Sequence, residues 1–128
     1  MAKTNIQYDL SLEERPGYLY AVICSDTIDR ISAIEYLFQI AAKATNLGYK
    51  NILLRRDIPM MLNDPDLFFT TREFADLMRG KRVAFINPHA VNDETMDFSM
   101  VIAKNRGATF MMHPDEGSAI KWLLDPDH

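Results

Sequence analysis

The chain has 128 residues, of which 48% are hydrophobic and 25% are charged, with a formal net charge of −4 and a pI near 5.3. This composition is typical of a globular protein, and we expect one domain over residues 1–128. An acidic chain is a poor prospect for binding nucleic acid or an anionic membrane. The single cysteine, Cys24, excludes an intramolecular disulfide bond.

The ends and apolar runs of the chain point to a cytoplasmic protein. The N-terminal segment MAKTNIQYDL is polar and lacks the apolar core of a signal peptide. No apolar run approaches the ~20 residues that a membrane-spanning helix needs. We therefore expect no transmembrane segment.

The first half of the chain predicts a hairpin followed by a helix and a strand. Residues Asn5–Leu12 alternate between apolar and polar, whereas Tyr18–Cys24 is apolar throughout, as in a central strand. The turn signal in EERPG between them favours antiparallel pairing. Apolar residues at helical spacing follow over Thr27–Asn46, with Thr27 as the N-cap. The segment NILLRRDI within Tyr49–Ile58 then predicts a third strand, and its paired arginines are expected to be solvated.

The second half predicts three further helices. Two prolines and Asn63-Asp64 make Pro59–Phe69 irregular, so the next helix is expected to begin at Thr70 or Thr71 and run to Arg79. Lys81–Leu124 then has the pattern strand, helix, strand, helix, with Asp93 and Asp115 as helix N-caps.

Together these elements predict an α/β fold with the order β-β-α-β-α-β-α-β-α. A helix leading into a buried strand is the crossover element of a parallel sheet. We expect a mixed, mostly parallel sheet of about five strands with helices packed on it, and the N-terminal hairpin supplies its antiparallel edge.

The residue types that catalysis requires do not form a recognisable pattern. His89 and His113 each follow a predicted strand, but neither has another ligand at metal-binding spacing, and His128 is the last residue. A surface or capping role is the simpler interpretation of both loop histidines. The five glycines are too far apart for a nucleotide-binding loop. We therefore expect no cofactor, no metal and no enzymatic activity.

One fragment, LLRRDIPM, is similar to the phosphoacceptor region of response-regulator receivers. The rest of a receiver site is missing: Asp26 stands alone after its strand, Asn87 occupies the position of a hydroxyl residue, and His113-Pro114 stands in place of Lys-Pro. Without an acid pair to hold Mg²⁺ and without the lysine, an active receiver is not expected.

The pattern of the whole chain, over about residues 5–124, resembles the STAS-like fold and in particular the SpoIIAA-like family of small uncharacterised bacterial proteins. The stretches that carry the likeness are GYLYAVICSDTI, GYKNILLRRDI, RVAFI and AKNRGATFMMHPDEGSAIKWLL. The resemblance implies a non-enzymatic module that binds partners or apolar ligands.

In the anti-sigma-factor antagonists of this fold, a phosphorylated serine at the start of the second helix switches partner binding. This chain departs from that pattern, because no serine lies between Ser32 and Ser99. Thr70 and Thr71 are the only hydroxyl residues near the predicted helix start. They are therefore the candidate phosphorylation sites, and capping would explain them equally well.

The segment before that helix is unusually apolar for a loop. Its large side chains are a candidate partner or ligand surface, formed by Met60, Met61, Leu67, Phe68 and Phe69. The simpler interpretation is that they fold back onto the core. Two functional interpretations remain. The segment forms a partner groove or dimer face, or it is a lid over an apolar cavity lined by Met96 and Met100.

Three functions follow in order of preference. The first is a STAS-like protein-interaction or regulatory module without catalysis, whose protein partner is unknown and which is expected to form a homodimer. The second is a carrier of a small apolar or lipid-like ligand. The third is a small enzyme that uses His89, His113 and the carboxylates.

Overall fold

The computed structural model describes residues 5–89 and 93–125, and the side chains of residues 93–98 lie outside that description. The elements follow one another as β1 (Asp9–Arg15), β2 (Tyr18–Cys24), α1 (Arg30–Leu47), β3 (Asn51–Asp57), α2 (Asp64–Leu77), β4 (Arg82–Ile86), α3 (Asp93–Asn105), β5 (Thr109–Met112) and α4 (Glu116–Leu124). The predicted order of strands and helices is confirmed.

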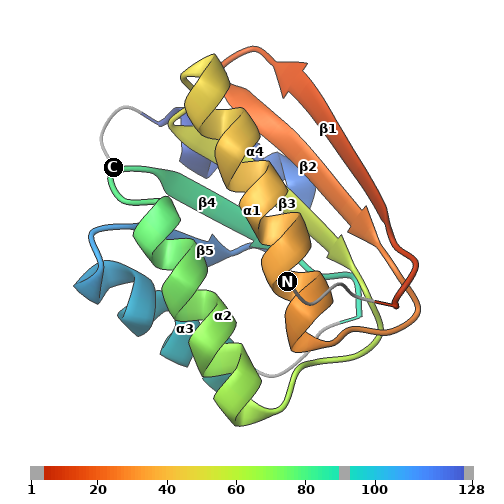
Figure 1. Cartoon of the computed structure of the whole chain (residues 1–128). Helices are drawn as coiled ribbons and strands as arrows, with labels where there is room; N and C mark the ends of the chain where they lie inside the picture. The colour runs from red at the N-terminus through yellow and green to blue at the C-terminus, as the bar shows by residue number, and fades with distance from the viewer. Residues whose placement is uncertain (1–4, 90–92, 126–128) are drawn as a thin grey trace.

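The five strands form one sheet in the order β1-β2-β3-β4-β5 (Figure 1). β1 pairs with β2 in the antiparallel sense, and β2, β3, β4 and β5 are parallel to their neighbours. The mixed, mostly parallel sheet with an antiparallel hairpin at its edge is therefore as predicted.

The direction in which the sheet grows decides where the helices lie. Each parallel strand is added on the same side of the one before it, and right-handed crossovers then place every connecting helix on the same face. Figure 1 shows α1, α2 and α3 in front of the sheet and α4 behind it. α2 packs against both α1 and α3, so the three crossover helices form one continuous layer.

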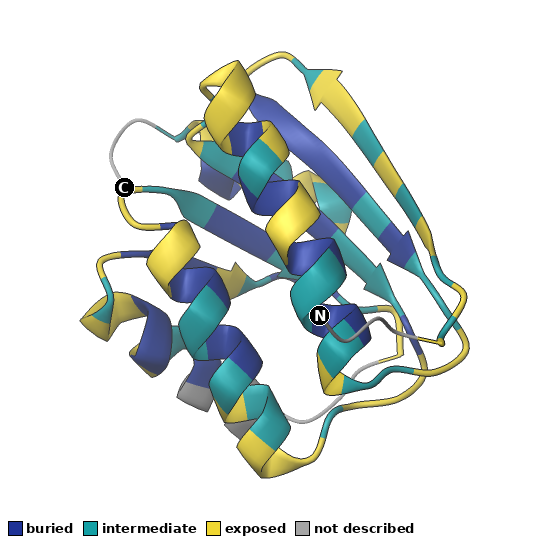
Figure 2. Cartoon of the chain, in the orientation of Figure 1, coloured by how far each residue is buried: buried dark blue, intermediate teal, exposed yellow. Residues whose placement is uncertain are grey.

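Each face of the sheet has its own hydrophobic core, as Figure 2 shows for the layer in front. On β2, Leu19, Ala21 and Ile23 face the larger core beneath α1, α2 and α3. The alternate residues Tyr18 and Tyr20 face the smaller core beneath α4. Alternation of side chains along a central strand explains why this segment is apolar throughout.

The N-terminal strand and the first helix begin later than predicted. β1 covers Asp9–Arg15 rather than Asn5–Leu12, because the tight turn at Pro16-Gly17 lets Arg15 pair directly with Tyr18. The N-cap of α1 is Asp29, not Thr27. The Asp29 carboxylate accepts the Ser32 N–H at 2.7 Å, and the Ser32 hydroxyl oxygen accepts the Asp29 N–H at 3.1 Å.

The largest error of sequence interpretation concerns α2. The segment Pro59–Phe69 is not irregular throughout: a helix begins at Asp64, and Asn63 caps it by accepting the Asp66 N–H at 2.9 Å. Pro65 lies in the first turn, where a missing N–H costs no helical hydrogen bond. The predicted capping role of Thr70 and Thr71 is therefore wrong, because both lie in the middle of the helix.

The last two helices agree with the prediction where the structure describes them. α3 covers Asp93–Asn105, and the predicted capping by Asp93 and cavity lining by Met96 concern side chains outside the described residues. Asp115 caps α4, and its carboxylate accepts the Ser118 N–H at 2.8 Å. Within the described residues, no helix is long and apolar enough to cross a membrane.

Candidate functional site

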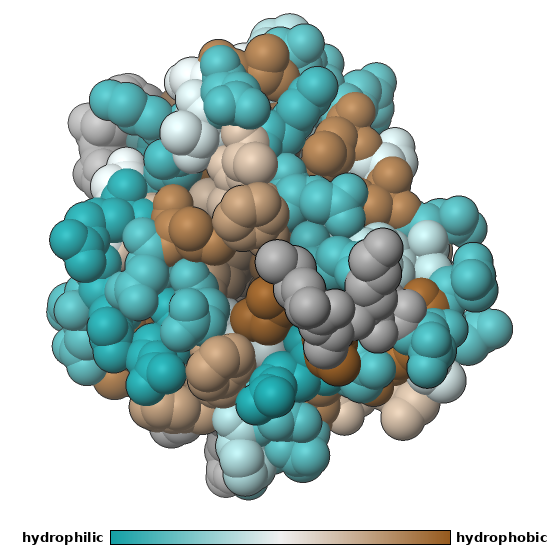
Figure 3. Space-filling model, in the orientation of Figure 1, coloured by the Kyte–Doolittle hydropathy of each residue, from teal (hydrophilic) through white to brown (hydrophobic). Residues whose placement is uncertain are grey.

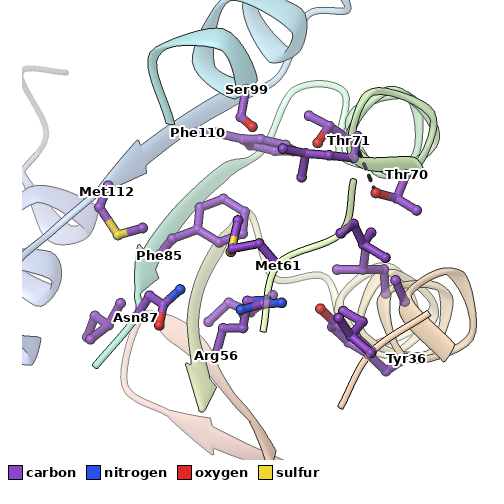
Figure 4. Close-up of a pocket in the computed structure, with 17 residues that line it drawn as sticks. Tyr36, Arg56, Met61, Thr70, Thr71, Phe85, Asn87, Ser99, Phe110 and Met112 are labelled. Carbon is purple, nitrogen blue, oxygen red and sulfur yellow. Dashed lines mark hydrogen bonds between the residues drawn. The ribbon is translucent and has the colours of Figure 1, made fainter. Parts of the chain in front are cut away.

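An apolar cavity of about 90 Å³ lies between the helical layer and the sheet, near the carboxyl ends of the parallel strands. Its walls come from α1, α2, α3 and three strands, and Figure 4 shows the side chains around it. The lining residues are Ile28, Ala33, Tyr36, Leu37, Leu54, Arg56, Met61, Leu62, Leu67, Thr70, Thr71, Phe85, Ile86, Asn87, Ser99, Phe110 and Met112.

The sheet supplies an aromatic floor to the cavity. Phe85 of β4 and Phe110 of β5 point from neighbouring strands toward the helical layer, with ring centroids 5.2 Å apart in an edge-to-face arrangement. Phe74 of α2 packs beside them, with its ring centroid 5.4 Å from that of Phe110. Edge-to-face packing is a preferred arrangement of aromatic rings, so these contacts favour the ring orientations of this wall.

Arg56 is the only charged side chain among the described residues that line the cavity. It follows Leu54 by two positions on β3 and therefore points to the same face of the sheet. Its guanidinium donates to the carbonyl oxygen of Ile58 at 3.1 Å and to that of Met60 at 2.5 Å. These bonds tie the loop after β3 to the strand, so the loop forms one side of the cavity mouth.

Polar groups lie at both ends of the cavity. At one end, Figure 4 shows Arg56 between Tyr36 and Asn87. At the other end, the hydroxyl groups of Thr71 and Ser99 come from α2 and α3. Burial raises the pKa of Tyr36, and the neighbouring Arg56 guanidinium partly opposes this effect.

The predicted apolar surface divides into two parts in the structure. Met61 and Leu67 line the cavity, so part of the segment does fold back onto the core. Met60, Met61 and Phe68 nevertheless remain 42% to 48% exposed. Figure 3 shows hydrophobic surface in the hollow between α1 and α2.

The fifth residue of that predicted surface, Phe69, is half-buried and lies between two arginines. The guanidinium carbons of Arg30 and Arg72 lie 5.1 Å and 5.6 Å from its ring centroid. These distances are those of cation–π contacts. Phe69 therefore joins the start of α1 to α2 and does not present its ring freely.

The two candidate phosphorylation sites are buried. Thr70 is 3% and Thr71 is 9% exposed, and the Thr70 hydroxyl donates to the Leu67 carbonyl oxygen at 3.2 Å. A kinase would reach either hydroxyl only after α2 opens locally. Phosphorylation there stays a prediction.

A second, polar hollow lies at the ends of β2 and β3, beside the cavity mouth. His89 contacts Asp57 through Nε2 at 2.6 Å from Oδ1, and the Cys24 thiol lies 3.9 Å from the other carboxylate oxygen. Sequence spacing gave no sign of this contact, because the two residues are brought together by neighbouring strand ends. Burial raises the pKa of the Cys24 thiol, and the charge of Asp57 raises it further.

The other loop histidine, His113, is packed into the protein interior. His113 is buried, and its ring centroid lies 5.2 Å from that of Trp122 on α4. The backbone N–H of His113 donates to the Phe85 carbonyl oxygen at 2.8 Å. Within residues 5–89 and 93–125, the structure brings no three His, Cys, Asp or Glu side chains together as a metal site would.

The most polar part of the cavity, at Arg56, was not predicted from the sequence. The Arg55-Arg56 pair was expected to be solvated, yet Arg56 lines the cavity and is half-buried. The signal that identifies it is alternation: Ile52, Leu54 and Arg56 share one face of β3. Among the described side chains of α3, Ser99 lines the cavity and Met100 does not, so the predicted role of Met100 is wrong.

Comparison with known proteins adds the fold but no activity. No protein-family model matches the chain, and no curated protein sequence matches it. A solved structure with the same architecture is an uncharacterised protein of the DUF3478 family from Shewanella loihica, described as having a SpoIIAA-like fold. It is 15% identical, the alignment covers 97% of this chain and 99% of that one, and the TM-score is 0.51. At this identity the likeness establishes architecture alone, and the chain has a SpoIIAA-like fold.

Proposed function

We propose that the protein is a non-enzymatic regulatory or interaction module that works by binding a small apolar ligand in the cavity beneath α1 and α2. The observation that carries this proposal is the cavity itself. Well-packed interiors contain few voids larger than a water molecule, and an apolar void costs stability. A void of about 90 Å³ is therefore best explained by an occupant.

The lining matches the usual composition of a small-molecule site. Most of its side chains are aliphatic or aromatic, and a few polar groups lie at its two ends. Met61 lies at the mouth on a loop, where a flexible, unbranched side chain adapts to an entering group. In this proposal Met61 is both part of the ligand surface and part of the lid.

The proposal of a non-enzymatic role rests on the surroundings of the groups that could react. The Cys24 thiol has a raised pKa, which reduces the thiolate that a nucleophile requires. His113 is packed against Trp122. The His89–Asp57 pair is open to solvent, with both side chains about two-fifths exposed. We also expect a cytoplasmic location, which cell fractionation would test.

Hexan-1-ol is a suitable neutral probe for the cavity. In a methyl-resolved NMR titration we expect it to shift the signals of Leu37, Leu54 and Leu67, which line the cavity. The Ser99→Leu variant fills the space from α3 and should abolish these shifts. Val101→Leu is the matched control on the exposed side of the same helix and should bind as wild type does.

A second variant protects this test against misfolding. Ala33→Val fills the cavity from α1 by two carbon atoms, at a packing cost of about 1–3 kcal/mol. Weaker hexan-1-ol binding by both filling variants supports the cavity as the site. Shifts that survive both substitutions, or no shifts in wild type, would overturn the proposal.

A second candidate is a docking surface for another copy of the chain. The exposed side chains of Met60, Met61 and Phe68 favour it, because large apolar groups are enriched at dimer interfaces. Sedimentation velocity should then show a dimer that Phe68→Ser weakens. Met111→Ser, on the opposite face of the sheet, is the control and should leave the dimer intact. A monomer at all concentrations would exclude this candidate.

A further inference from the structure

The charged end of the cavity specifies its ligand more narrowly than the apolar walls do. Arg56 is half-buried, and a guanidinium remains charged at every pH at which proteins fold. Among the described residues, no carboxylate forms an ion pair with it: the ion pairs are Arg15–Glu13, Arg72–Glu73, His89–Asp57 and Arg106–Asp76. A cation in such a setting attracts an anion, because partly buried charges are stabilised by a partner.

The guanidinium also has donors left for a ligand. It carries five N–H groups: the carbonyl oxygens of Ile58 and Met60 take one from each terminal nitrogen, and the Tyr36 side chain accepts another, which leaves two. The fork of the guanidinium matches a carboxylate, to which it donates two parallel hydrogen bonds. A ligand carboxylate is therefore the anion that this geometry fits best.

Asn87 adds a neutral donor at the same end. Its amide oxygen accepts the N–H of His89 at 2.9 Å, which assigns the amide nitrogen to the opposite side. Figure 4 shows that nitrogen directed upward, on the side of Phe85 and Met112. Arg56 lies on β3 and Asn87 directly follows β4, the neighbouring parallel strand, so the two side chains lie at the same end of the cavity.

The remaining space sets the length of the ligand. From Arg56 and Asn87 the cavity continues past Phe85 to Phe110, a path without charged groups in the described lining. Its volume of about 90 Å³ is below the ~150 Å³ of a cavity that holds benzene. The enclosed tail is therefore short.

We propose that Arg56 and Asn87 form a head-group subsite for short-chain carboxylates, whose apolar tail lies against Phe85 and Phe110. This inference rests on the proposed function and names its ligand class. Charge selects the ligand head, and the aromatic floor binds the tail.

The test compares hexanoate with hexan-1-ol, which has the same chain without the charge. Isothermal titration calorimetry or NMR titration of wild type should show tighter binding of hexanoate. Arg56→Gln should weaken hexanoate by about tenfold, the loss expected for a charge-assisted hydrogen bond. Arg56→Lys keeps the charge and should recover part of that loss. Arg55→Gln, on the opposite face of the same strand, should bind hexanoate as wild type does.

Binding of hexan-1-ol distinguishes failure of the head-group subsite from failure of the apolar ligand site. In Arg56→Gln its affinity should fall less than that of hexanoate, because both ligands lose the loop contacts of Arg56 but only hexanoate loses the charge. If hexan-1-ol binds in the cavity but hexanoate is no tighter, or is unaffected by Arg56→Gln, the head-group subsite is overturned and the apolar ligand site stands. If neither probe binds wild type, both proposals fail.

Discussion

At the scale of single residues, alternation along a strand gives identical neighbours different roles. Arg55 and Arg56 are indistinguishable in composition, charge and local sequence. The pleat directs Arg56 toward the core of the larger helical layer and Arg55 toward the face that α4 covers. The face was predictable from the period of two, whereas the cavity was not, because it depends on side-chain volumes from several elements.

Three tyrosines are expected to make the free energy of unfolding fall at alkaline pH. Burial, followed by hydrogen bonds to Glu35 and Glu116, raises the pKa values of Tyr8 and Tyr20 to about 12. Burial also raises the pKa of Tyr36. In the unfolded chain these phenols ionise near pH 10. The folded state therefore binds more protons above that pH, so the free energy of unfolding should fall as the pH rises past 10.

Urea titrations at pH 8 to 11.5 test this prediction. Tyr36→Phe should make the alkaline fall shallower, since it removes one group whose pKa differs between the folded and unfolded states. A free energy of unfolding that rises above pH 10, or a slope steeper in the variant, would contradict the assignment.

The environment of Cys24 predicts slow thiol chemistry. At pH 7 iodoacetamide should alkylate it more slowly than free cysteine, because burial and the charge of Asp57 raise the pKa of the thiol. Asp57→Asn should speed the reaction. Asp26→Asn removes a charge two residues after Cys24 and should change the alkylation rate little. A rate faster than that of free cysteine would refute this account of the polar hollow.

At the scale of elements, helix starts were the least predictable features. The cap at Asp115 was predictable, because Asp115 follows Pro114 and precedes Glu116, an acidic residue suited to a first helical turn. At α2 the prolines looked like helix breakers, although Pro65 in a first turn is compatible with a helix. Local sequence therefore predicts a loop from Asn63 to Phe69, whereas Leu67 and Phe68 lie in α2.

Asn63 provides a direct check of the corrected start. Asn63→Ala removes the acceptor of the Asp66 N–H and should lower the free energy of unfolding by about 1 kcal/mol. Asn46→Ala, at an exposed position in the last turn of α1, is the control and should not destabilise the protein. An equal effect of the two substitutions in urea titrations would argue against the cap.

At the scale of the whole molecule, topology explains where a ligand site can form. Strand order here never reverses, so the sheet lacks the switch point at which open α/β proteins usually bind ligands. All three crossover helices lie on one face, and the space beneath α1, α2 and α3 takes the place of that crevice. The fold was predictable from the order and apolar character of its segments, whereas the cavity required the packed structure.

Intermolecular NOEs between hexan-1-ol and the protein test the central claim most directly. The account predicts contacts from the terminal methyl group of the alcohol to the rings of Phe85 and Phe110, and their loss in Ser99→Leu. Contacts confined to Trp122 and Tyr18, on the opposite face of the sheet, would contradict it.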